Sequence, residues 1–219
     1  MTNYNRLIVY ACSFGWSGAV NPYIPWYLDN SFPDLLSRKL NLQLDNRSMP
    51  GTNPESQFHS ILYDIEQNKI LETDFVIIQW THVDRIFSDR WGSLMPHIDD
   101  QNIRWYYEHV YNISYSVNKL LSYINTLETI LPNLHHNFAD GIKYIRDHGS
   151  SVLVNKLENI KYIGFSEKSI VHHLWDIAGD NKKFNYPCCH PTKEGHDLIA
   201  SLYHQEILSK YYYDKNCNF

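Results

Sequence analysis

The sequence lacks the features that mark several large classes of protein. No run of apolar residues approaches the roughly 18 to 20 that cross a membrane, so we expect no transmembrane segment. Lysine and arginine number 19 against 24 aspartates and glutamates, which gives a formal net charge of −5. This charge disfavours a nucleic-acid partner, because such proteins display a basic face to the phosphate backbone. The chain also contains no internal repeat and no low-complexity linker.

Cysteine is scarce, and its spacing fits neither a disulfide scaffold nor a metal site. The four cysteines form no CxxC pair: Cys12, Cys188, Cys189 and Cys217. Neighbouring cysteines are poor disulfide partners, because adjacent Cα atoms lie only about 3.8 Å apart. The tract that ends in His190, and the other histidines near it, lack the spaced pairs that converge on a structural zinc ion. We therefore expect neither a metal nor another cofactor.

The N-terminal residues and the composition favour an ordinary cytoplasmic globular protein. The stretch MTNYNR is polar and leads directly into a strand-like run, so no signal peptide is recognised. The chain has 219 residues, of which 43% are hydrophobic and 20% charged, enough to bury a sizeable core. We expect a single domain over residues 1–219 with a loosely held tyrosine-rich tail at 211–219, located in the cytoplasm.

Apolar periodicity predicts strands alternating with helices. Continuous or alternating apolar runs predict five strands, at residues 6–11, 40–48, 74–80, 150–155 and 160–165. Apolar residues at helical spacing predict helices at residues 32–40, 54–70, 103–131, 134–148 and 193–211. Such alternation is typical of an α/β fold with a mostly parallel sheet between two helical layers.

Polar residues follow the predicted strands at the points where the strands end. Ser13, in YACSFGW, follows the first strand, and Gly51 and Asn53, in MPGTN, follow the second. Thr81 and His82, in QWTHVDR, follow the third. Ligands of open α/β sheets bind beyond the carboxyl ends of the strands, so we expect these segments to converge on one site.

The residue types at this edge suit nucleophilic catalysis. A serine hydroxyl needs an adjacent base, and His190, which precedes Pro191 in an extended turn, is a candidate for that role. The N–H groups of Ser13 and Gly51 and the amide of Asn53 are candidate donors for an oxyanion. Purely structural roles remain open for these residues, since Ser13 and His190 also suit loop positions and Asn53 suits a helix N-cap.

Other residues near this edge have more ordinary readings. Cys12 precedes Ser13 on the strand and should point the opposite way, so it is disfavoured as a nucleophile. Trp80 is expected in the core or the pocket wall, and His196 within a partly buried helix. Arg85 either forms a surface pair with Asp84 or binds an acidic group of a substrate.

Four blocks of the sequence resemble the SGNH (GDSL-like) hydrolase superfamily, particularly its divergent members with an early CSF.W block. YACSFGW resembles the nucleophile block, MPGTN the glycine block, FVIIQWTHVDR the third block and HPTKEGH the terminal block. The resemblance implies a flavodoxin-like three-layer α/β/α sandwich with a mostly parallel five-stranded sheet. It also implies that Ser13 is the nucleophile, His190 the base and Gly51 an oxyanion donor. The implied activity is hydrolysis of an acyl or acetyl ester on a carbohydrate, lipid or small molecule through an acyl-enzyme.

The sequence departs from this family at two positions. The third block usually ends in Gly-x-Asn-Asp, whereas here His82 stands in place of the oxyanion asparagine, so Asn53, Thr81 or His82 itself is the substitute donor. The family commonly places an aspartate three residues before the catalytic histidine, and here that residue is Pro187. The candidate orienting acids are then Asp176 and Asp180. Two alternatives stay open, a catalytically impaired binding module and an acyltransferase that uses the same residues.

Overall fold

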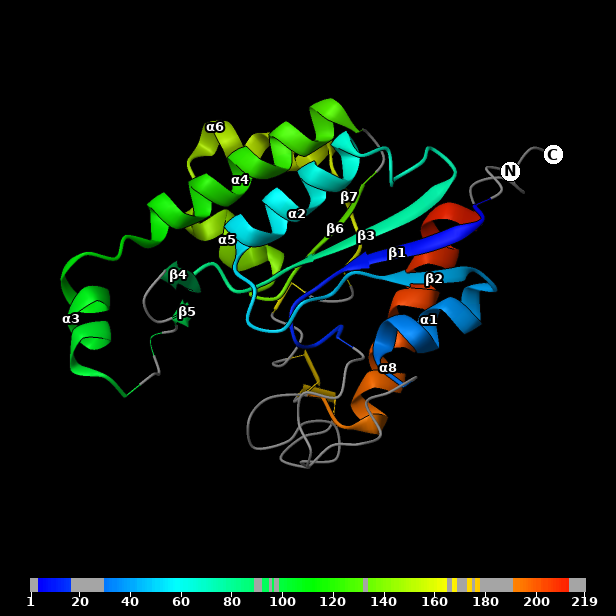
Figure 1. The fold of residues 1–219 in the computed structure, drawn as a ribbon, viewed down its shortest axis with the longest axis horizontal. Coiled ribbons are helices and arrows are strands. Elements are labelled where there is room, and N and C mark those ends of the chain that lie inside the picture. Colours follow the sequence, from blue (N-terminus) through cyan, green and yellow to red (C-terminus); the bar gives the residue numbers. More distant parts are fainter. Residues whose placement is uncertain are drawn as a thin grey trace.

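A sheet of five parallel strands lies between two layers of helices in the computed structural model (Figure 1). The structure describes residues 4–16, 30–88, 92–94, 96, 99–131, 134–164, 167–168, 173–174, 176–177 and 191–212. The strands are β1 (Arg6–Tyr10), β2 (Gln43–Asn46), β3 (Asp74–Trp80), β6 (His135–Phe138) and β7 (Lys161–Tyr162). They follow the order β2-β1-β3-β6-β7, and every pairing is parallel. The expected flavodoxin-like order and the five-stranded sheet are thus confirmed.

The helices divide between the two faces of this sheet (Figure 1). One face is covered by α2 (Pro54–Glu66), α4 (Ile113–Ile130), α5 (Ile142–His148) and α6 (Ser151–Val154). The other face is covered by α1 (Phe32–Leu40) and α8 (Lys193–Ile207). Two separate hydrophobic cores result, one on each side of the sheet.

Strand β1 supplies side chains to both cores. Ile8 and Tyr10 pack beneath α2 and α4, whereas Leu7 and Val9 pack against α1 and α8. All four are at most 2% exposed. Because successive side chains of a strand point to opposite faces, a continuous apolar run is required where both faces are covered. Each such burial contributes roughly 1.5–3 kcal/mol relative to an exposed side chain.

The remaining elements lie outside the sandwich. An antiparallel hairpin, β4 (Ile86–Ser88) and β5 (Gly92–Leu94), and helix α3 (Gln101–His109) extend beyond one end of the sheet (Figure 1). A 3₁₀ turn, η2 (Asn155–Asn159), precedes β7, and a π-helical turn, η3 (Leu208–Tyr212), follows α8. Among the helices in the described ranges, none is long and apolar enough to cross a membrane.

Four predicted elements differ in the structure. The predicted helix at 103–131 is two helices, because the side chain of Asn112 caps α4 by accepting the Tyr115 N–H at 2.9 Å. The predicted strand at 40–48 is shortened, because Asn41 ends α1 in the left-handed conformation with φ 54°. The predicted strand at 150–155 is wrong, since this segment contains α6, and its Val152 is 71% exposed rather than buried in a sheet.

The predicted helix at 134–148 is correct only for its second half, which is α5, because the segment begins with the fourth strand of the sheet, β6. The sequence of β6, HHNF, does not indicate a buried strand, because three of its four side chains are polar. Their polar atoms find partners on neighbouring strands and on α4. Asn137 Nδ2 donates to the Ile163 carbonyl at 2.7 Å, and His135 Nδ1 lies 3.1 Å from the Val76 carbonyl. Burial lowers the pKa of His135 to about 3, so its ring is neutral in the core.

A chain of hydrogen bonds through His136 ties β3 to β6 and α4. Trp80 Nε1 donates to His136 Nδ1 at 3.0 Å, and His136 Nε2 lies 2.8 Å from Glu128 Oε1. Trp80 and His136 are both 0% exposed. Because Nδ1 accepts from the indole, Nε2 carries the proton and donates to the carboxylate. Trp80 is therefore a core residue, as expected.

Replacing Trp80 by phenylalanine should destabilise the protein. Trp80→Phe leaves the buried Nδ1 of His136 without a donor, which costs about 1–3 kcal/mol, and it opens a cavity as well. Trp105→Phe is a matched control, because Trp105 is 56% exposed and should change stability by less than about 0.5 kcal/mol. Urea unfolding followed by circular dichroism measures both. Equal stability of the two variants would contradict a stabilising role for the hydrogen bonds through His136.

Candidate active site

Three loops meet at the carboxyl edge of the sheet because of the strand register. Tyr10 of β1 pairs with Ile78 of β3, and Trp80 of β3 pairs with Phe138 of β6. The residues that follow these strands therefore emerge side by side. Ser13 follows β1, His82 follows β3, and Asp140 follows β6 at the same edge, which the sequence alone does not reveal.

Ser13 lies in a tight turn that directly follows β1. The Gly15 N–H donates to the Cys12 carbonyl at 3.0 Å, and Asn46 Nδ2 donates to the Gly15 carbonyl at 2.8 Å. Cys12 is 1% exposed, whereas Ser13 is half-buried. The turn thus presents the serine at the edge of the sheet and keeps the cysteine inside.

Gly15 is required in this turn because its backbone approaches two neighbours closely. A Cβ atom at this position would lie 2.5 Å from Ala11 Cβ and 2.6 Å from Ser48 Oγ. These separations are shorter than van der Waals contact, so any larger residue has to push the turn away from β1.

The loop after β2 brings Gly51 and Asn53 to the start of α2. Gly51 has φ 71°, which favours glycine. Asn53 is the N-cap of α2, since its Oδ1 accepts the Ser56 N–H at 2.7 Å. The cap uses the oxygen of the side chain, so the amide nitrogen is the group that Asn53 has left to donate.

Gln57 fixes the beginning of α2 against the end of β3. Its Nε2 donates to the Gln79 carbonyl and its Oε1 accepts the Thr81 N–H, both at 2.9 Å. Gln57 is 4% exposed and Thr81 1% exposed, so both bonds are buried. These bonds set the position of Asn53 relative to the loop after β3.

His82 and Asp140 form a close pair at this edge. His82 Nδ1 lies 2.5 Å from Asp140 Oδ1, and the Val83 N–H donates to Asp140 Oδ2 at 2.9 Å. Burial disfavours the imidazolium, but the hydrogen bond that His82 donates to Asp140, together with the charge of Asp140, outweighs burial and raises the pKa of His82. Asp140 was missed in the sequence because its segment was predicted as a helix, so that it was not recognised as following a strand.

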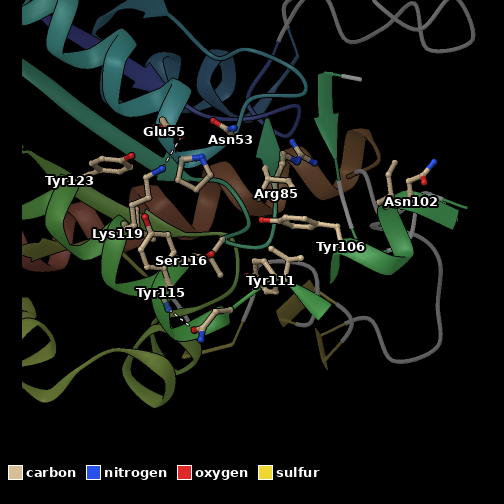
Figure 2. Close-up of a pocket in the computed structure, with 17 residues that line it drawn as sticks. Asn53, Glu55, Arg85, Asn102, Tyr106, Tyr111, Tyr115, Ser116, Lys119 and Tyr123 are labelled. Carbon is tan, nitrogen blue, oxygen red and sulfur yellow. Dashed lines mark hydrogen bonds and ion pairs between the residues drawn. The ribbon is translucent and has the colours of Figure 1, made fainter. Parts of the chain in front are cut away.

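A cavity of about 800 Å³ opens next to Asn53, between α2, α3 and α4. Figure 2 shows side chains from these helices and from the loop after β3 around one hollow. Four tyrosines line it: Tyr106, Tyr111, Tyr115 and Tyr123. Lys119 Nζ donates to Glu55 Oε2 at 2.9 Å, and this bond lowers the pKa of Glu55. The volume falls in the range of small-molecule sites.

Arg85 connects the candidate catalytic edge to this cavity. It lines the cavity, and its Nη1 donates to the Thr52 carbonyl at 3.2 Å (Figure 2). The neighbouring Asp84 carbonyl accepts from the Tyr107 hydroxyl of α3 at 2.5 Å. The loop after β3 is therefore held by both the loop after β2 and α3, and Arg85 is part of the cavity lining.

The remaining predicted residues are His190, Asp180, Asp176 and His196. His190 and Asp180 lie outside the described residues. Asp176 is exposed, and its Oδ2 accepts from Lys168 Nζ at 2.7 Å; its role as orienting acid stays a prediction. His196 is 0% exposed within α8, and its Nδ1 accepts the Phe32 N–H at 3.1 Å. Within the described ranges, no three histidine, cysteine or acidic residues cluster as metal ligands.

Comparisons with known proteins establish the fold. No protein-family model matches the chain, and no curated protein matches it. A lipase/acylhydrolase from Enterococcus faecalis is similar in structure, with 12% identity, TM-score 0.56, and coverage of 94% of this chain and 96% of that one. A member of the lipolytic G-D-S-L family from Veillonella parvula has 13% identity, TM-score 0.57, and coverage of 94% and 98%. An acetylxylan esterase from Geobacillus stearothermophilus has 14% identity, TM-score 0.58, and coverage of 94% and 96%. The chain thus has the fold of the GDSL (SGNH) hydrolases.

Replacing Gly15 by alanine should disturb both stability and the position of Ser13. Gly15→Ala places a methyl group against Ala11 and Ser48, and such overpacking costs about 1–3 kcal/mol. Thermal unfolding measures the loss of stability, and the rate of Ser13 labelling by a fluorophosphonate measures the displacement of the turn. Wild-type stability together with wild-type labelling would contradict the close approach.

Proposed function

We propose that this protein is a serine ester hydrolase in which Ser13 is the nucleophile and His190 the base. The observation that carries the proposal is the arrangement at the carboxyl edge, where the Ser13 turn adjoins the loop of Gly51 and Asn53. The pairing of Met49 N–H with the Ala11 carbonyl at 2.9 Å holds these two loops together. The fold shared with solved lipases and esterases supports the same reaction class.

The reaction proceeds through a covalent acyl-enzyme. Ser13 Oγ attacks the ester carbonyl while its proton passes to the imidazole of His190, and the carbonyl electron pair moves to oxygen. The N–H groups of Ser13 and Gly51 and the amide of Asn53 donate to this oxyanion. The oxyanion collapses, the alcohol leaves with the proton from His190, and water releases the acid by the same steps in reverse.

The lining of the tyrosine-lined cavity favours a compact polar substrate rather than a substrate with a long alkyl chain. Its lining carries tyrosine hydroxyls, asparagine amides and one ion pair, which a lipid chain would have to desolvate without compensation. Aromatic faces together with hydrogen-bonding groups suit a sugar ring, which has an apolar face and a polar rim. We therefore favour an acylated carbohydrate, with the sugar in the cavity and the ester at Ser13.

Ser13→Ala should abolish ester hydrolysis, because the acyl-enzyme then cannot form. The expected loss of kcat for p-nitrophenyl acetate is at least about 10³-fold, since a serine and its base act as a unit. His190→Ala should cause a comparable loss, and a fluorophosphonate should label the wild type but not Ser13→Ala. Turnover in Ser13→Ala equal to that of the wild type would rule out the mechanism. Product analysis with added alcohols separates hydrolysis from acyl transfer.

Tyr106→Ala should weaken the binding of a sugar ester and leave a small ester unaffected. Loss of one aromatic contact should raise KM for an acetylated xylo-oligosaccharide about three- to tenfold. The KM for p-nitrophenyl acetate, which does not fill the cavity, should stay the same. Tyr63→Ala is the matched control, because Tyr63 is exposed on α2 and outside the cavity lining. Equal effects of both substitutions on both esters would contradict the assignment of the cavity.

A further inference from the structure

The pair of His82 and Asp140 is built like a catalytic dyad, although no step above uses it. The two side chains are 25% and 15% exposed, so the pair lies at the surface of the site rather than deep in the core. The imidazole of His82 lies 6.5 Å, centroid to centroid, from the ring of Phe14, the residue directly after Ser13. The pair is therefore adjacent to the proposed nucleophile.

The hydrogen bonds of Asp140 determine which atom of His82 faces a ligand as a donor. Asp140 Oδ2 accepts the Val83 N–H and Asp140 Oδ1 contacts Nδ1 of the imidazole, so we assign the proton of this contact to Nδ1, with the carboxylate as its acceptor. The remaining ring atom is Nε2, which has no hydrogen-bond partner among the described residues. In neutral His82 this atom is an acceptor, and in the imidazolium it is a donor.

The surrounding charges favour the imidazolium. Asp140 and Asp84 raise the pKa of His82, and burial and Arg85 oppose them with a smaller combined effect. Tyr111 and Tyr144 also lie near Asp140, and burial raises the pKa of both hydroxyls, that of Tyr144 to about 12. These tyrosines stay neutral through the pH range in which His82 titrates.

We infer that His82, held by Asp140, is a cationic oxyanion donor, with its Nε2–H directed at the carbonyl oxygen that becomes negative when Ser13 attacks. This inference rests on the proposed function and adds a catalytic residue to it. The proton stays on His82 throughout, while the proton of Ser13 moves to His190. Asp140 is a positioning residue, because it fixes the ring and its charge without touching the substrate.

A charged donor makes the rate depend on pH in a direction opposite to that of a general base. The donor form of His82 exists below its pKa and is lost as the pH rises through that value. The value of kcat/KM should therefore fall on the alkaline side through the titration of His82. A base in the same place would make the rate rise through that titration instead.

Three variants separate these roles with p-nitrophenyl acetate. His82→Ala should lower kcat about 10²–10³-fold with little change in KM, as for loss of one oxyanion donor. His82→Asn restores a neutral donor, so it should recover much of the rate and remove the alkaline decline. Asp140→Asn should move the decline to lower pH, because the protonated fraction falls about tenfold for each unit by which the pKa falls. His59→Asn is the matched control, since His59 is exposed on α2 and should keep the wild-type profile.

A measurement without turnover tests the same assignment. A fluorophosphonate adduct of Ser13 places a phosphonyl oxygen where the oxyanion forms, so the pKa of His82 measured by NMR should rise further in the adduct. The pKa of His82 should be lower in Asp140→Asn than in the wild type. An unchanged His82 titration in the adduct, a wild-type rate in His82→Ala, or a rate that rises through the His82 titration would each overturn the inference. Absence of Ser13-dependent labelling would instead overturn the proposed function, and the inference with it.

Discussion

The parallel pairing of β3 with β1 on one side and β6 on the other is the constraint on which the candidate site depends. The register fixes Tyr10 opposite Ile78 and Trp80 opposite Phe138. With these pairs in place, the loops after three strands have to leave the sheet at one edge. A slip of one residue in β6 would turn its side chains to the opposite faces. It would also separate Asp140 from His82.

The register of β6 is held largely by polar bonds, and this explains what the sequence could predict. The runs at 6–11 and 74–80 were recognised because apolar burial on both faces is encoded locally. Strand β6 was missed because its buried polar side chains depend on partners distant in the chain, such as Val76 and Trp80. Conversely, none of the residues of α6 within the apolar run at 150–155 is buried. Its local pattern alone therefore predicted a buried strand that the fold does not contain.

The same distinction applies to the site. Ser13 and Gly51 carry local signals, a hydroxyl after a strand and a glycine at a turn with positive φ, so sequence reasoning could propose both as site residues. The partner of His82 lies 58 residues further along the chain, in the segment whose strand was missed. From the sequence alone, His82 was one of three candidate substitute donors. Its contact with Asp140 is what supports the proposal that it acts as a charged donor.

Three cationic side chains around this edge each contact a neighbouring acceptor, which is a carboxylate for two of them and a carbonyl for the third. Asp140 pairs with His82, the Thr52 carbonyl accepts from Arg85, and Glu55 pairs with Lys119 at the start of α2. An ester is neutral on binding, carries a negative charge only while the tetrahedral intermediate exists, and ends as a carboxylate. In the proposed mechanism, a donor that is paired with a carboxylate, as His82 is with Asp140, would stabilise the brief oxyanion at short range. It would hold a free carboxylate product weakly, because beyond contact distance such a pair is close to neutral. On this proposal, Asp140 would serve turnover as well as the position of the donor.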